Sequence, residues 1–77
     1  MPSYSVRIHH GEYSSTGTVD LPDDDAARHE VSAVCADLAR DIVPSLNEGR
    51  EYRLEVADQT GTVLRVLRLT AESFYPK

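Results

Sequence analysis

The chain has 77 residues, with 13 acidic side chains against eight lysines and arginines, so its formal net charge at pH 7 is −5. A chain of this length accommodates one domain, which buries only about 60% of the surface that the unfolded chain exposes. The single cysteine excludes an internal disulfide and a cysteine-based zinc cluster, and the negative charge disfavours nonspecific binding to nucleic acid or to an anionic membrane.

The first residues lack the basic stretch and the following apolar run of a secretory signal, and no segment approaches the roughly 18 apolar residues of a membrane helix. We therefore expect a cytoplasmic protein without membrane contact. The charge is unevenly distributed, since residues 1–43 carry eight acids and three arginines, whereas residues 44–77 carry five acids and five bases. The whole net charge belongs to the first part of the chain.

Two strands are predicted near the start of the chain. Tyr4, Val6 and Ile8 alternate with polar residues, which is the period of a strand with one buried face. Residues 11–17 are rich in glycine and serine and are typical of a turn. Residues 18–21 then repeat the alternation, which predicts a short second strand.

The stretch from Asp23 to Val43 predicts one amphipathic helix. Its apolar residues recur at steps of three and four, which places them on one face: Ala27, Val31, Val34, Cys35, Leu38 and Ile42. Asp23 is the expected N-cap, and Asp24 and Asp25 follow in the first turn, where free backbone N–H groups and the helix dipole favour carboxylates. Pro44 ends the helix because it lacks the N–H that the helical hydrogen bond requires.

Two further strands, at residues 52–57 and 63–69, are predicted to form a hairpin around the tight turn at residues 58–61. A three-residue loop at residues 59–61 sets the predicted register. It pairs three sets of residues: Val56 with Leu64, Leu54 with Val66, and Glu55 with Arg65.

This register leaves four residues of the last strand on the face away from the helix: Val63, Arg65, Leu67 and Leu69. Three aliphatic side chains on an open face favour an interface, and we expect a second copy of the same chain as the partner. The competing interpretation is that the end of the chain, through Phe74 and Tyr75, covers these residues within one molecule.

Together the elements predict a single α+β domain over residues 1–77, of ββαββ type, with a disordered tail at residues 71–77. A helix of about 20 residues is roughly 30 Å long and therefore crosses a four-stranded sheet. The favoured right-handed crossover between the second and third strands predicts an antiparallel sheet of strand order 2-1-3-4.

Several short motifs carry a resemblance to a known family. They are Met1-Pro2-x-Tyr4, the strand, turn and glycine at residues 6–11, Leu21-Pro22-Asp23, Ala26-Ala27-Arg28 and Val56-Ala57-Asp58-x-x-Gly61. Together they span nearly the whole chain and resemble a family of short bacterial proteins that is known only as a domain of unknown function. Because the motifs mark a strand end, a helix cap and a hairpin turn, the resemblance implies the fold and carries over no catalytic residue.

The candidate reactive groups each have a simpler structural interpretation. His9 and His10 are neighbours in a strand and project to opposite faces, which disfavours a shared metal ion. The acids at residues 23–25 fit helix capping better than a cation-binding loop. Cys35 lies on the apolar helix face, and His29, the histidine nearest to it in sequence, falls on another side of the helix. We therefore expect no metal, no cofactor and no enzymatic activity.

The function that these observations favour is a non-enzymatic protein-interaction module that self-associates through the outer face of its sheet. The alternative is nucleic-acid or nucleotide binding on the open face, where four basic residues would project together: Arg7, His9, Arg53 and Arg65. Proteins that bind single strands stack bases on aromatic side chains, and here Tyr4 and Tyr52 are assigned to the buried face. Nucleic acid is therefore the less favoured partner.

Overall fold

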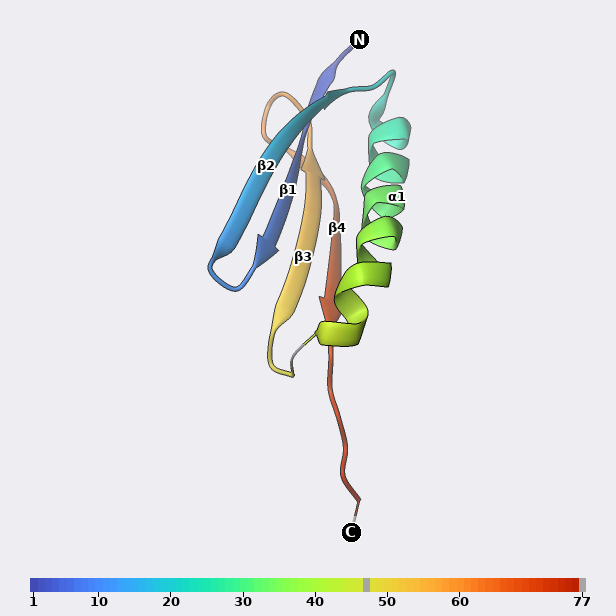
Figure 1. Cartoon of the computed structure of the whole chain (residues 1–77). Coiled ribbons are helices and arrows are strands. Elements are labelled where there is room, and N and C mark those ends of the chain that lie inside the picture. The colour runs from blue at the N-terminus through green and yellow to red at the C-terminus, as the bar shows by residue number, and fades with distance from the viewer. Residues whose placement is uncertain (47, 77) are drawn as a thin grey trace.

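The computed structural model describes residues 1–46 and 48–76. Its elements in chain order are β1 (Ser3–His10), β2 (Tyr13–Asp20), α1 (Asp24–Ile42), the 3-10 helix η1 (Val43–Ser45), β3 (Glu51–Ala57) and β4 (Val63–Thr70). The four strands form one antiparallel sheet of order β2-β1-β3-β4, and α1 packs on one of its faces (Figure 1). The predicted ββαββ fold and strand order are confirmed.

The second strand is longer than predicted. β2 pairs with β1 along its whole length, from Asp20 opposite Ser3 to Tyr13 opposite His10. The serines and threonine that suggested a turn are strand residues, because pairing with β1 outweighs their local preference for turns. The chain reverses instead at Gly11, whose φ of 58° lies in the left-handed region that glycine adopts without strain.

The helix begins where the sequence predicts. The carboxylate of Asp23 accepts a hydrogen bond from the backbone N–H of Ala26 at 2.8 Å, and Asp24 and Asp25 occupy the first turn. At the other end α1 stops at Ile42, and Pro44 lies within the short helix η1 that follows. The predicted N-cap at Asp23 and the predicted end within two residues of Pro44 are both confirmed.

The core lies between α1 and the middle of the sheet. Five buried residues form it: Tyr4, Ala27, Val31, Leu54 and Val56. α1 contacts β3 and β4 and lies away from β2 (Figure 1). A helix is about 10 Å wide whereas neighbouring strands are about 4.8 Å apart, so one helix covers about two strands of the four.

The β3–β4 connection is organised by one carboxylate. Asp58 Oδ1 accepts hydrogen bonds from the backbone N–H and hydroxyl of Thr60, at 2.9 and 2.7 Å, and from the N–H of Thr62 at 3.0 Å. Gly61, with φ of 87°, completes the turn. The Thr60 hydroxyl, followed by the backbone N–H groups, lowers the pKa of Asp58 below its ordinary value of 3.8, against a smaller opposing effect of burial.

The register of this hairpin differs from the predicted one. A β-bulge between Val56 and Ala57 adds one residue to β4, so the residues beyond it shift by one position. The observed pairs are Val56 with Arg65, Glu55 with Val66 and Leu54 with Leu67. The predicted pairs were wrong, because the loop length alone does not reveal a bulge. A shift of one residue exchanges the two faces of a strand.

The end of the chain runs away from the sheet rather than over it (Figure 1). Phe74 and Tyr75 are 81% and 82% exposed, and the Tyr75 hydroxyl donates to Glu48 at 3.3 Å. The competing interpretation, in which these aromatic residues cover the outer face, was therefore wrong. Disorder of residues 71–77 stays a prediction, and Lys77 lies outside the described residues.

The core assignment is tested by a pair of identical substitutions. Val31 is fully buried and Val43 is 53% exposed. Val31→Ala should lower the free energy of unfolding by roughly 2–3 kcal/mol, because it removes two buried methyl groups and leaves a cavity. Val43→Ala should change it by less than about 0.5 kcal/mol. Chemical denaturation measures both, and equal effects of the two substitutions would contradict the core described above.

The Asp58 turn predicts a dependence of stability on pH. The pKa of Asp58 is lower in the folded state than its ordinary 3.8, so its contribution is present above that value and is lost as the pH falls through the folded pKa. Asp58→Asn keeps an acceptor oxygen but no charge. The parent should therefore be more stable than the variant at neutral pH, and the difference should shrink below about pH 3.8. Chemical denaturation at a series of pH values measures both proteins. A difference in unfolding free energy that stayed constant with pH would contradict this role of the Asp58 carboxylate.

Candidate functional site

The sheet face opposite α1, here called the open face, is mostly polar. Its residues alternate along each strand with those that point toward the helix. The register brings the following side chains to it: Ser3, Ser5, Arg7, His9, Ser14, Thr16, Thr18, Asp20, Glu51, Arg53, Glu55, Ala57, Val63, Val66, Arg68 and Thr70. Such a face needs no covering layer for stability and is available for contact.

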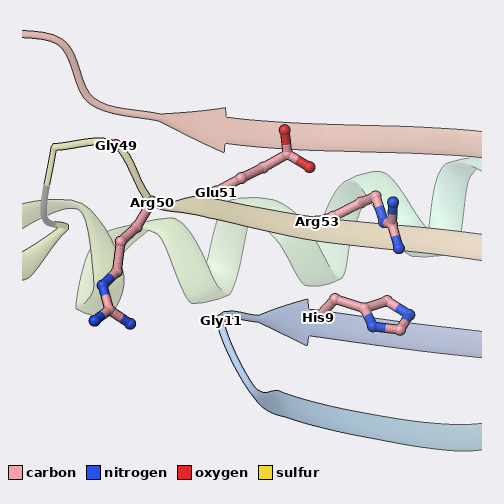
Figure 2. Close-up of a pocket in the computed structure, with 6 residues that line it drawn as sticks. All are labelled: His9, Gly11, Gly49, Arg50, Glu51 and Arg53. Carbon is pink, nitrogen blue, oxygen red and sulfur yellow. The ribbon is translucent and has the colours of Figure 1, made fainter.

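Three basic side chains cross the open face in one line. His9 on β1 lies opposite Arg53 on β3, which in turn lies opposite Arg68 on β4. We call these three residues the basic row. Figure 2 shows the side chains of His9 and Arg53 on the same side of neighbouring strands. Like charges directly opposite one another destabilise a strand pair, so an anion bound over Arg53 and Arg68 would relieve a repulsion within the sheet.

The acidic neighbours neutralise this face only in part. Arg7 pairs with Glu55 at 3.5 Å, and Arg68 Nε lies 3.6 Å from a carboxylate oxygen of Glu51. Both distances are long for charge-assisted hydrogen bonds, and exposed pairs of this kind contribute little stability. Arg53 Nε is buried and has no hydrogen-bond partner within residues 1–46 and 48–76. Arg53 is thus the centre of the row and keeps an unused donor.

A depression of about 500 Å³ adjoins one end of the basic row, and Figure 2 shows the residues that line it. It is lined by His9, Gly11, Gly49, Arg50, Glu51 and Arg53. A Cβ at Gly11 would lie 3.0 Å from a guanidinium nitrogen of Arg50, so the glycine leaves room for this arginine beside the β1–β2 turn. Arg50 therefore adds a further cation next to the row.

The structure brings together three of the four basic residues predicted for the open face. Arg7, His9 and Arg53 all lie on it. Arg65 does not, because the bulge places it on the helix side, where its guanidinium donates to Ser32 Oγ on α1 at 2.9 Å. Sequence reasoning missed Arg68, which the incorrect register had assigned to the other face.

The predicted apolar interface on β4 does not form a single face. Val63 lies opposite Ala57 and is 47% exposed. Leu67 instead lies opposite the buried Leu54 and packs against the core. Leu69 lies opposite Tyr52, which also packs against the core. Val63 thus lies on the outer face as predicted, whereas the outer placement of Arg65, Leu67 and Leu69 was wrong, because the observed register puts them together on the helix side.

A second depression lies at the start of α1 and is lined by residues that include Tyr4, Asp24 and Asp58. The Tyr4 hydroxyl donates to Asp24 at 3.0 Å. Burial of the ring, followed by this hydrogen bond, raises the pKa of Tyr4 above 10.0. The Asp58 carboxylate already accepts the hydrogen bonds of the β3–β4 turn. These groups therefore stabilise the ends of β1, α1 and β3.

The other candidate groups are dispersed. His10 stacks on Tyr52, with ring centroids 4.2 Å apart, on the helix side of the sheet. Cys35 is a half-buried free thiol on α1. Within the described part of the chain, no cluster of three or more histidine, cysteine or acidic side chains could hold a metal ion. In the same residues, no helix combines the length and apolar character needed to cross a bilayer.

The fold and this face define a small α+β domain with one covered and one open sheet face. The chain belongs to the family described as a domain of unknown function, DUF6894, which matches residues 4–70. This confirms the resemblance to a domain of unknown function, although the match does not test the individual motifs. No curated protein and no solved structure matches the chain.

The revised faces of β4 are tested by the same substitution at adjacent positions. Leu67→Lys should lower the free energy of unfolding by roughly 2–4 kcal/mol, because it places a charge beside the core. Val66→Lys should change it by less than about 1 kcal/mol, since Val66 lies on the open face opposite Glu55. Thermal or chemical denaturation distinguishes the two variants. The reverse order of stability would restore the register predicted from loop length.

Proposed function

We propose that the protein is a non-enzymatic interaction module whose open face binds an acidic segment of a protein partner. The observation that carries this proposal is the basic row, in which Arg53 lies between His9 and Arg68. Guanidinium groups bind carboxylates through two parallel hydrogen bonds, and partial burial strengthens such contacts.

The net charge of −5 does not oppose this proposal, because the fold separates the charges. Five acids lie on α1, over the opposite face of the sheet: Asp24, Asp25, Glu30, Asp37 and Asp41. The two helix arginines, Arg28 and Arg40, already pair with Asp25 and Asp37. On the open face, Glu55 pairs with Arg7 and Glu51 with Arg68, so neither of these acids neutralises Arg53.

An acidic peptide fits this face better than a nucleic acid. Single-stranded nucleic acid is held by aromatic side chains that stack on bases. Tyr4 and Tyr52 pack against the core on the helix side, and the described outward residues of the four strands include no tyrosine, phenylalanine or tryptophan. The carboxylates of an acidic peptide, by contrast, can be bound by cationic side chains and hydrogen-bond donors without a stacking ring. Nucleic-acid binding by the same arginines is the competing outcome of the test.

Self-association through the outer face is not proposed, because the observed register removes the aliphatic stripe on which it depended. A flat polar face with a few arginines is better suited to a partner of opposite charge than to a second identical face, since two basic rows would repel. The cytoplasmic location expected from the sequence stays a prediction.

The test is a binding titration with a short labelled oligoglutamate peptide, with oligoglutamine and oligothymidylate as comparisons. The parent should bind oligoglutamate most tightly, and binding should weaken as salt rises above about 150 mM. Arg53→Ala combined with Arg68→Ala should weaken it at least about tenfold, which corresponds to about 1.4 kcal/mol.

The matched control is Arg28→Ala combined with Arg40→Ala, which changes the net charge equally but alters only the helix surface. It should bind like the parent. Equal losses in the two double variants would indicate a nonspecific charge effect. Tighter binding of oligothymidylate than of oligoglutamate, lost with Arg53 and Arg68, would favour the nucleic-acid alternative.

A further inference from the structure

The two edges of the sheet differ in how they resist pairing with another strand. β2 and β4 are the edge strands. Natural proteins protect an edge with charged side chains, prolines, bulges or a covering element, because an unprotected edge pairs with another chain. β4 has such protection, with two arginines and a bulge, and α1 packs against it.

β2 lacks these features over residues 13–19. It pairs with β1 over eight consecutive residues without an irregularity. Residues 13–19 contain no charged side chain and no proline. The free backbone groups of this edge therefore form a regular ladder, uncharged over residues 13–19, of the kind that accepts another strand.

The space beside β2 is also open. α1 lies over β3 and β4, on the far side of the sheet from this edge (Figure 1). A Cβ built at Gly17 would meet no atom within 4 Å. Tyr13, at the start of the strand, is 58% exposed. A second strand can approach without displacing any described part of the molecule.

We infer that β2 pairs antiparallel with β2 of a second copy of this chain, which joins two four-stranded sheets into one. Glu12 and Asp20 flank the uncharged stretch, so an acidic peptide of the kind proposed for the open face is disfavoured here. An uncharged strand is favoured, and β2 itself is one. A twofold axis allows each copy to satisfy the other's edge with the same residues.

The flanking acids also select the register. Centring the pair on Thr16 would place Glu12 opposite the partner's Asp20, and like charges directly opposite are destabilising. Centring it on Gly17 places Asp20 opposite the partner's Ser14. It also sets Tyr13 opposite the partner's Leu21, which gives the exposed ring an apolar neighbour. The interface is therefore centred on Gly17.

Two experiments on the full chain test this interface. In sedimentation at high protein concentration, the parent should have twice the monomer mass of 8.5 kDa. Gly17→Lys should sediment as a folded monomer, because two lysines would meet at the twofold axis in a position where the side chain itself has room. Gln59→Lys, an equal charge change in the β3–β4 turn, should remain dimeric.

The register is tested by cross-linking in a Cys35→Ala background. Gly17→Cys should form a disulfide with its counterpart under mild oxidation, since directly opposite antiparallel residues lie within disulfide reach. Thr16→Cys, which would lie opposite the partner's Thr18, should cross-link far less. Oligoglutamate binding should persist in the monomeric Gly17→Lys variant, so this test is independent of the proposed function.

A parent that stays monomeric at high concentration would overturn the inference, and so would a Gly17→Lys variant that remains dimeric. Preferential cross-linking at residue 16 would overturn the Gly17-centred register. Loss of the dimer in Gln59→Lys as well would show that added charge, rather than the β2 edge, controls association.

Discussion

The structure depends on one contact, in which the buried face of α1 packs against the centre of β3. Ala27 and Val31 on the helix and Leu54 and Val56 on the strand are all fully buried. Because a single helix is only about as wide as two strands, this contact leaves one sheet face and one sheet edge without a covering layer. A chain of 77 residues has no second α-helix within its described part to cover them.

The uncovered surfaces have different chemistry, which suits them to different partners. The open face carries three arginines, one histidine and three acids, whereas the five acids of α1 lie on the other side of the sheet. The β2 edge is uncharged along residues 13–19 and presents backbone groups rather than side chains. Electrostatic contacts would give specificity on the first surface, and strand pairing would give affinity on the second.

Periodicity predicted the fold well, because helix and strand patterns depend on neighbouring residues. The Asp23 cap, the apolar helix face and the strand order all agree with the structure. The candidate site was predicted only in part. Leu64 is the extra residue of β4, because its neighbours Val63 and Arg65 pair with the adjacent residues Ala57 and Val56. Such a bulge depends on the pairing of β4 with β3, and no local sequence pattern marks it. That one residue moved Arg65 to the helix and brought Arg68 to the open face.

The central claim is that the open face, rather than the helix surface, receives an acidic partner. The most direct measurement is a map of backbone amide chemical shifts during titration with oligoglutamate. The account predicts saturable changes centred on residues 7–9, 53 and 68, with those in α1 unchanged. Changes confined to α1, or spread evenly over the molecule, would contradict it.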